Sequence, residues 1–281
     1  MVRNLLSKFI LFIFFLVSMQ FTVSTASHFV LVHGACHGSW CWYKVATLLK
    51  SAGHKVTAVD LGGAGINPKQ PNQIPTLSVH LEPLMRFMAA LEPEEKVILV
   101  GHSAGGIAIS IAAEKFTKNV AAAVYVTAIM PQPGFNVLNF YQQVRSSESG
   151  DSNFTIETGA GSSSFLFGPK YLESRLYQLS PPEDLTLALS SIRPFPVFRD
   201  EASREAAELT NKKYGSIRRV FIVSERDMII PEKIQKETIA SYPPHDVKEI
   251  SGSDHMVMLS KPQELASLLQ TVSEEMVMHL Y

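Results

Sequence analysis

The stretch VILVGHSAGGIAISI, residues 97–111, decides the fold. Four β-favouring residues lead into the pentapeptide GHSAG, which has the pattern G-x-S-x-G, and an Ala/Ile-rich segment typical of a helix follows. Glycines are needed at Gly101 and Gly105 because side chains there would collide as strand and helix close around the turn. Such a turn holds its serine in a strained conformation above the sheet. We therefore predict Ser103 as a nucleophile, against the alternative of an ordinary strand–helix connection.

A nucleophilic serine needs a base and an acid, and later parts of the chain supply both. A serine hydroxyl attacks well only when a neutral imidazole takes its proton and a carboxylate holds that imidazole. Asp227 follows a predicted strand at residues 220–223, and His255 follows another at residues 247–250. Reactive groups gather past the carboxyl ends of strands in an open α/β sheet. These positions predict a catalytic triad of Ser103, Asp227 and His255.

Other ionisable residues near these motifs receive structural interpretations. Asp254 adjoins His255, and neighbouring loop side chains usually point apart, whereas Glu225 sits very close to the end of its strand. Both stay open as alternative acids. His102 should point away from the nucleophile and pack or hydrogen-bond below the turn. His33 should brace the loop that follows the first predicted core strand.

Two backbone N–H groups are predicted to bind the oxyanion that develops during acyl transfer. One belongs to Ala104, which directly follows the nucleophile. The other belongs to Ala35 in the loop HGACHG, residues 33–38, where glycines let the backbone approach a substrate. We expect the shape of this loop to matter nearly as much as the triad.

Four longer segments carry a family resemblance. They are HGACHGSWCWYKVATLLKSAGHKVTAVDL, EKVILVGHSAGG, FGPKYL with LYQLSPPEDLTLA, and SGSDHMVMLSKPQEL. Together they resemble the plant methylesterase and hydroxynitrile lyase family of α/β-hydrolases, from about His28 to the C-terminus. The resemblance implies an α/β-hydrolase fold, with a mostly parallel sheet flanked by helices and an inserted cap.

The same resemblance leaves two chemistries to distinguish. The lyases carry a threonine two residues before the loop cysteine and a lysine after the catalytic histidine, whereas this chain has Gly34 and Met256. A departing cyanide anion needs a charge such as an ammonium group, which a thioether lacks. We therefore expect Gly34 and Met256 to be substrate-binding positions of an esterase. The implied substrates are methyl esters of small hydrophobic acids, such as methyl jasmonate, methyl indole-acetate and methyl salicylate.

Two alternatives to the esterase remain. One is a hydroxynitrile lyase acting on cyanohydrins. The other is a hormone-binding receptor that keeps the hydrolase fold without turnover, because fold alone does not determine function. The complete candidate triad favours an active enzyme over the receptor, whereas Gly34 and Met256 oppose the lyase.

Predicted strands and helices alternate, which favours a mostly parallel sheet covered on both faces. The strands are predicted at 29–32, 55–60, 97–100, 121–126, 220–223 and 247–250, and the helices at 40–51, 77–91, 106–116, 231–240 and 262–278. The alternation stops in an aromatic, Ser/Gly/Pro-containing stretch. We interpret residues 131–198 as a cap over a core formed by residues 28–130 and 199–281.

Composition limits the classes of partner. The chain has 281 residues, 46% of them hydrophobic and 18% charged, with a formal net charge of −1, which suits one domain with an insertion. Near-neutral charge without a basic cluster argues against nucleic acid or an anionic membrane surface. Neither a zinc-type Cys/His cluster nor a nucleotide-binding glycine loop is present in the sequence, so no metal and no cofactor is expected. The oligomeric state stays open, with a homodimer as one option.

The N-terminus differs from the rest. Arg3 and Lys8 precede an apolar run at residues 9–17, and residues 24–26 offer a small-residue cleavage site. This layout predicts a secretory signal peptide over residues 1–26 and a secreted mature chain. An uncleaved membrane anchor, or an extension without function on a cytoplasmic protein, are the alternatives.

Entry into the secretory pathway affects two further predictions. Asn153 begins the sequon Asn-Phe-Thr in a polar stretch and becomes a candidate glycosylation site. Cys36 and Cys41 could pair in an oxidising compartment, but a bridge would distort the loop that carries the predicted oxyanion donor. We predict two free, buried thiols.

Overall fold

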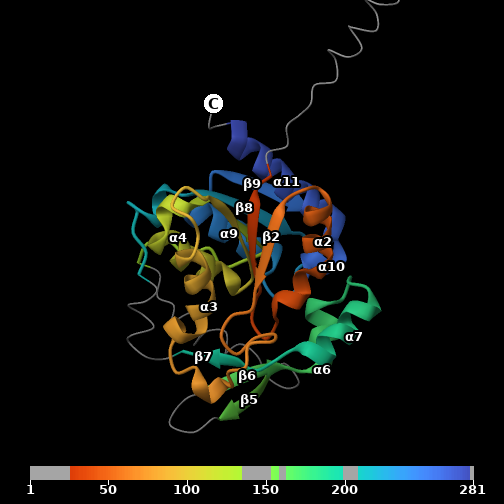
Figure 1. The fold of residues 1–281 in the computed structure, drawn as a ribbon. Helices are drawn as coiled ribbons and strands as arrows, with labels where there is room; N and C mark the ends of the chain where they lie inside the picture. The colour runs from red at the N-terminus through yellow and green to blue at the C-terminus, as the bar shows by residue number, and fades with distance from the viewer. Residues whose placement is uncertain (1–25, 135–152, 158–162, 199–207, 279–281) are drawn as a thin grey trace, which may run out of the picture.

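The computed structural model describes residues 26–134, 153–157, 163–198 and 208–278, and its centre is a parallel sheet (Figure 1). Six strands pair in the order β2-β1-β3-β4-β8-β9, and every pairing is parallel. Their bounds are β1 His28–Val32, β2 Lys55–Val59, β3 Val97–His102, β4 Val120–Val126, β8 Arg218–Ser224 and β9 Asp246–Ile250. The predicted fold class is thereby confirmed.

Helices cover both faces of this sheet. α2, α10 and α11 pack together on one face, and α3, α4 and α9 lie on the other, as right-handed crossovers require (Figure 1). The longer helices are α2 Tyr43–Ser51, α3 Leu77–Ala89, α4 Gly105–Lys115, α9 Glu232–Ser241 and α11 Pro262–Met278. Short turns are η1 Ser39–Trp42, η2 Pro71–Gln73, η3 Thr117–Asn119, η5 Tyr214–Ser216 and α10 Val257–Ser260.

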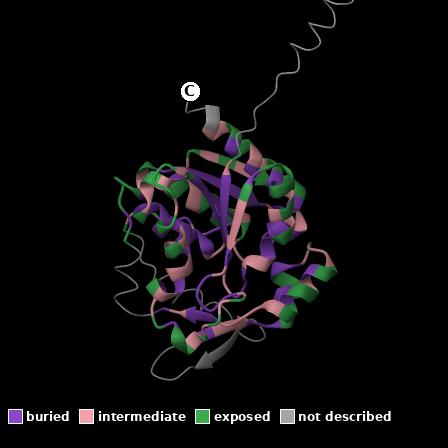
Figure 2. Ribbon diagram, in the orientation of Figure 1, coloured by how far each residue is buried: buried purple, intermediate pink, exposed green. Residues whose placement is uncertain are grey.

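Burial explains why the central strands are continuously apolar. Every residue of β1 and β3 is buried, whereas the edge strand β9 alternates between partly buried and exposed positions until Ile250 (Figure 2). A strand covered on both faces buries both sets of side chains, and an edge strand buries fewer of them.

The order of strands also determines where a site can form. From β1 the chain crosses to the edge strand β2 and then returns past β1 to β3. The parallel neighbours β1 and β3 are therefore followed by connections that run toward opposite edges of the sheet. The loops after two such strands diverge and leave a crevice at the carboxyl end of the sheet. Residues 33–38 follow β1 and Ser103 follows β3, so the predicted oxyanion loop and the predicted nucleophile lie at this same end of the sheet.

A second, antiparallel sheet lies beyond that end of the core sheet (Figure 1). It contains β5 Asn153–Glu157, β6 Ser163–Phe167 and β7 Phe195–Val197, with α6 Pro169–Tyr171, the π-helical η4 Leu172–Leu176 and α7 Pro182–Ser191 inserted between β6 and β7. These elements fall within the stretch interpreted as a cap. The sequence pattern predicted none of them, and Asn153 lies at the start of β5.

Polar contacts join this cap to the core. Asp184 of α7 accepts hydrogen bonds from Lys44 Nζ at 2.5 Å and from the Tyr43 hydroxyl at 2.9 Å. The Arg193 guanidinium donates to the carbonyl groups of Gly65, Asn67 and Lys69. The cap is therefore held to the core at α2 and at the loop after β2.

Some helix bounds differ from the sequence prediction, and one of these differences has a local cause. The helix predicted at 40–51 begins as the 3-10 turn η1, because the Ser39 N–H donates to Asp60 Oδ1 at 2.6 Å and Cys41 N–H bonds back to Gly38 at 3.1 Å. The helix predicted from residue 106 starts one residue earlier, at Gly105. The predicted signal peptide lies outside the described residues, except for Ala26. In the described ranges no helix has the length and apolar character needed to cross a membrane.

Candidate active site

The turn between β3 and α4 has the strain that the sequence predicts. Ser103 has a φ of +52°, a left-handed conformation that non-glycine residues rarely adopt. Its carbonyl accepts the N–H groups of Gly106 at 3.1 Å and Ile129 at 3.0 Å, which fixes the turn. A Cβ on Gly105 would stand 2.6 Å from the His33 carbonyl oxygen, so the close approach of loop and helix requires glycine. The turn is a nucleophile elbow in its geometry.

Asp227 and His255 meet beside this elbow. The His255 Nδ1–H donates to Asp227 Oδ2 at 2.7 Å, and both side chains are buried. The N–H groups of Ile229 and Ile230 donate to the other carboxylate oxygen at 2.6 and 2.9 Å. Burial alone would raise the pKa of Asp227, but the charge and hydrogen bonds of its partners outweigh burial and hold that pKa below its usual value.

Thr127 is a further contact of this carboxylate, and the sequence pattern did not predict it. Its hydroxyl donates to Asp227 Oδ2 at 2.5 Å, the same oxygen that His255 contacts. Thr127 directly follows β4 and is fully buried, with a φ of +37°. A threonine at the end of an apolar strand gives no sequence signal of such a contact.

The two alternative acids have other partners. Asp254 Oδ2 accepts the Leu179 N–H at 3.0 Å and the Ser180 hydroxyl at 2.8 Å, so this carboxylate binds the cap. Glu225 accepts the Gly252 N–H at 2.7 Å. Among the described residues, Asp227 is the carboxylate that bonds the His255 ring.

His102 and His33 lie close to the elbow and make structural hydrogen bonds. The His102 Nε2–H donates to the His255 carbonyl at 2.8 Å, and the centres of the two rings are 4.7 Å apart. Burial, and next the neighbouring His255 charge, lower the pKa of His102, so this ring stays neutral. His33 Nδ1–H donates to Gly34 at 2.8 Å and its Nε2 accepts the Leu61 N–H at 3.2 Å, which braces the loop after β1.

A second bracing contact holds the loop that carries Ala35. His37 Nδ1–H donates to the Ala35 carbonyl at 2.8 Å, and the Tyr177 hydroxyl of the cap donates to His37 Nε2 at 2.6 Å. Cys36, between these loop residues, has a φ of +64°, so the turn is strained and needs this support. Burial lowers the pKa of His37 to about 3, which keeps the ring neutral and able to accept. The cap thus helps to position the predicted oxyanion loop.

The predicted substrate-binding positions have contrasting environments. A Cβ on Gly34 would stand 2.8 Å from Ser103 Cβ, so this glycine lies directly against the predicted nucleophile. Met256 is fully buried, and its N–H donates to Asp254 Oδ1 at 3.0 Å.

Both cysteines, Cys36 and Cys41, are free and buried, as predicted.

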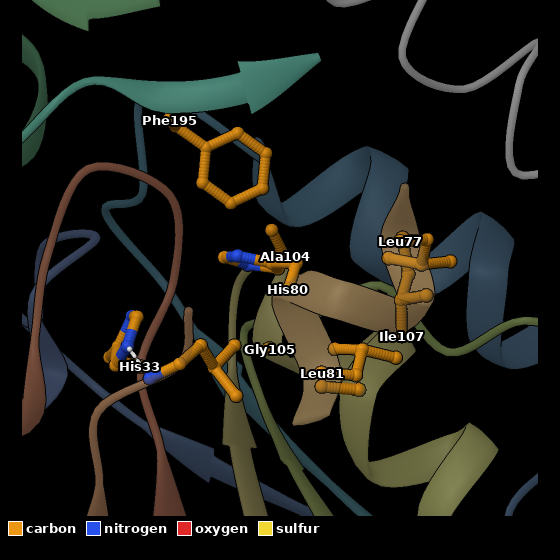
Figure 3. A pocket seen from close by; sticks show the side chains of 10 residues that line it. His33, Leu77, His80, Leu81, Ala104, Gly105, Ile107 and Phe195 are labelled. Atoms are coloured by element: carbon orange, nitrogen blue, oxygen red, sulfur yellow. Dashed lines mark hydrogen bonds between the residues drawn. The ribbon is translucent and has the colours of Figure 1, made fainter. Parts of the chain in front are cut away.

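A small cavity separates the elbow from cap strand β7 (Figure 3). Its volume of about 10 Å³ is near the smallest that can hold one water molecule. It is lined by His33, Leu61, Leu77, His80, Leu81, Ala104, Gly105, Ile107, Ala108 and Phe195. Burial lowers the pKa of both histidines, that of His80 to about 3, so this mainly apolar lining is uncharged at neutral pH.

Within the described residues, which include both Ser103 and His255, no hydrogen bond joins the side chains of these two. Catalytic hydrogen bonds are often long without substrate and tighten in the substrate complex. The elbow, the Asp227–His255 pair and the loop after β1 therefore form a candidate acyl-transfer site, in which the His255 carbonyl is hydrogen-bonded to His102 of the elbow.

Comparisons with known proteins show the family of the chain. A model of the alpha/beta hydrolase family matches residues 29–268. Methyl jasmonate esterase 1 of Vitis vinifera is 49% identical over 252 residues, covering 88% of this chain and 97% of the relative. Salicylic acid-binding protein 2 of Nicotiana tabacum is 44% identical over 250 residues, covering 86% and 96%. The crystal structure of tomato methylketone synthase I complexed with 2-tridecanone is 44% identical, with a TM-score of 0.83 and coverage of 89% and 99%. The chain therefore belongs to the α/β-hydrolase family and, within it, to the plant methylesterases.

Proposed function

We propose that this enzyme hydrolyses methyl esters of small hydrophobic carboxylic acids through a Ser103–His255–Asp227 triad. The observation that carries the proposal is the 2.7 Å bond between Asp227 and His255 beside the strained Ser103. The 49% identity to a methyl jasmonate esterase supports the choice of a methyl ester over other acyl compounds.

In the first step, His255 takes the proton of the Ser103 hydroxyl as its oxygen attacks the ester carbonyl carbon. Asp227 keeps the proton of the imidazole on Nδ1, so that Nε2 is free to act as the base, and stabilises the imidazolium that forms. The tetrahedral intermediate then breaks its bond to the methoxy group. His255 gives its proton to that oxygen, and methanol leaves an acyl group on Ser103.

In the second step, water replaces the serine hydroxyl. His255 takes a proton from the water as its oxygen attacks the acyl carbon, and returns the proton to Ser103 as the acid leaves. In both steps we propose that the N–H groups of Ala35 and Ala104 stabilise the oxyanion. The hydrogen bonds of His33 and His37 support that role, because they fix the loop carrying Ala35.

The side chains next to the elbow support an uncharged, hydrophobic acyl group. The cavity between elbow and cap is too small at about 10 Å³ to hold that group, but its lining shows that the side chains there are mainly apolar, together with two histidines that stay neutral. Gly34 and Met256 are the proposed substrate-binding positions. Methyl jasmonate, methyl indole-acetate and methyl salicylate have suitable acyl groups, and the names of the grape and tobacco relatives favour the jasmonate and salicylate esters.

A non-catalytic, acid-binding role is the second candidate, because the tobacco relative is named for binding salicylic acid. The lyase is less favoured. A threonine at Gly34 would place its Cβ only 2.8 Å from Ser103 Cβ, and Met256 brings no charge for a departing anion.

The test is a hydrolysis panel with the full-length chain. Methyl jasmonate, methyl indole-acetate, methyl salicylate and mandelonitrile are supplied in parallel to wild type and to Ser103→Ala, with release of acid or cyanide as the readout. The proposal predicts acid release from at least one ester, and its loss in the variant. Cyanide release alone would identify a lyase, and tight binding of free acid without turnover would identify a receptor.

We also propose that residues 1–26 are a signal peptide that directs the chain into the secretory pathway. The charged, then apolar, then small-residue layout supports this. Expression of the full chain in plant cells, followed by mass spectrometry of its N-terminus, should find Ser27 first. A chain that keeps Met1 would contradict the proposal. Peptide mass spectrometry of the same protein should show sugar on Asn153, and an unmodified Asn153 would contradict the predicted glycosylation.

A further inference from the structure

Thr127 occupies an unfavourable backbone conformation beside the proposed triad. It has a φ of +37°, and a branched Cβ makes left-handed geometry especially costly. Its N–H donates to the Ile222 carbonyl at 2.9 Å, so the strained residue is locked between β4 and β8. Such strain persists only where the surroundings impose it, and it is concentrated at functional sites.

The locked conformation directs the Thr127 hydroxyl onto Asp227. Oδ2 of Asp227 has two side-chain donors, the Thr127 hydroxyl at 2.5 Å and His255 Nδ1–H at 2.7 Å. Oδ1 is held by the backbone N–H groups of Ile229 and Ile230. Thr127 therefore shares with His255 the oxygen whose negative charge stabilises the imidazolium.

We propose that Thr127 is a positioning residue that sets the basicity of His255 through Asp227, an inference that rests on the proposed function. A donated hydroxyl draws charge from Oδ2 and weakens the attraction of that oxygen for the imidazolium proton. The hydroxyl therefore reduces the stabilisation that Asp227 gives to the imidazolium form of His255. The same bond fixes the rotation of the carboxylate, which keeps Oδ2 directed at Nδ1.

The ionisable groups around His255 other than Asp227 are neutral or have hydrogen-bond partners of their own. His102 on β3 and His37 in the loop after β1 stay neutral, because burial lowers both pKa values. Asp254, next in sequence, is buried and its oxygens accept hydrogen bonds from Leu179, Ser180 and Met256. Asp227 is the carboxylate that bonds the ring, and Thr127 is its one side-chain donor besides His255 among the described residues.

The test is the pH dependence of kcat/KM for Thr127→Val and Thr127→Ser in the full-length chain, on the methyl ester that wild type hydrolyses. Valine keeps the branched shape and removes only the hydroxyl, whereas serine restores a hydroxyl as the conservative rescue. We expect Thr127→Val to lower kcat/KM about tenfold at neutral pH, the scale of one buried hydrogen bond. We also expect the midpoint of its acidic limb to move to higher pH by about half a unit or more, with Thr127→Ser close to wild type.

A lowered kcat/KM with an unmoved acidic limb in Thr127→Val would overturn the inference, because it would show a purely structural role. If valine prevents folding, Thr127→Ala removes the same hydroxyl with less backbone strain and is held to the same criterion. The far-downfield proton NMR signal of His255 Nδ1–H, titrated with pH, needs no substrate. Its midpoint should rise without the hydroxyl and return with serine, so it tests Thr127 even if every ester is left intact.

Discussion

Replacing Gly34 by alanine tests how tightly the proposed oxyanion loop is packed against the proposed nucleophile, Ser103. The added Cβ would stand 2.8 Å from Ser103 Cβ and 3.0 Å from His102 Nδ1. Two carbon atoms pack at about 3.5–4.0 Å, so the overlap with Ser103 is about 1 Å. Neither neighbour can yield easily, because the strained turn fixes Ser103 and a hydrogen bond to the His255 carbonyl holds the His102 ring.

The loop itself must therefore move, and the Ala35 N–H moves with it. Misplacing a catalytic group by about 1 Å can cost about 100-fold in rate, and losing one oxyanion donor costs about 2.7–4 kcal/mol. We expect Gly34→Ala to lower kcat for methyl ester hydrolysis about 10²–10³-fold and to change KM much less. Initial rates over a range of ester concentrations separate the two constants.

Gly215→Ala is the matched control, because its Cβ would meet its nearest neighbour at 3.4 Å, an ordinary contact, and Gly215 precedes β8 whereas Asp227 follows it at the other end of that strand. That variant should keep wild-type kinetics. A folded Gly34→Ala protein with kcat within about threefold of wild type would refute the packing argument, since such a small effect leaves no room for a displaced donor.

Four further predictions follow from the same contacts. Asp227→Asn should lower kcat about 10⁴-fold with an unchanged circular dichroism spectrum, because an amide favours the wrong imidazole tautomer; a loss below tenfold would favour another acid. Tyr177→Phe leaves the buried His37 Nε2 without a donor and should cost about 1–3 kcal/mol in chemical denaturation as well as lowering kcat; an unchanged kcat would separate the cap from the oxyanion loop. His37 and His80 each have a pKa of about 3 when folded, so the unfolded chain binds more protons between pH 3 and about 6.5 and Tm should fall as pH is lowered through that window; replacing His80 by Gln should flatten the fall, and an identical slope would contradict it. Burial raises the pKa of Cys36 to about 12 and also raises that of Cys41, so a thiol reagent should modify neither in the native protein and both after unfolding, and rapid native labelling would show that the loop opens.

The positions of Ser103, Asp227 and His255 could be predicted because each follows a strand of the core sheet. A run of β-favouring residues marks the strand, and parallel packing then brings the carboxyl ends of separate strands to one edge. For these residues, recognising the strand that precedes each one was therefore enough to predict that they meet at one edge of the sheet. The glycines around Ser103 also allowed a strained turn to be predicted, and Ser103 has the corresponding left-handed φ of +52°.

Contacts that depend on the cap could not be predicted in the same way. Tyr177 and His37 lie 140 positions apart, and no periodic pattern links them. β6 and β7 are separated by an inserted helical segment, so their pairing has no turn signature between them. Thr127 was missed for a different reason, because its left-handed backbone is imposed by packing between β4 and β8 and is not a preference of threonine.

The central claim is that one activated serine, Ser103, hydrolyses the methyl ester. The most direct measurement is inactivation of the full chain by a fluorophosphonate, a reagent that labels activated serines. Intact mass spectrometry counts the adducts per chain, and the residual ester hydrolysis is plotted against that count. We expect a straight loss of activity that reaches zero at one adduct, mapped by peptide analysis to Ser103. Activity that survives complete labelling of Ser103, or that disappears with the label on another residue, would contradict the claim.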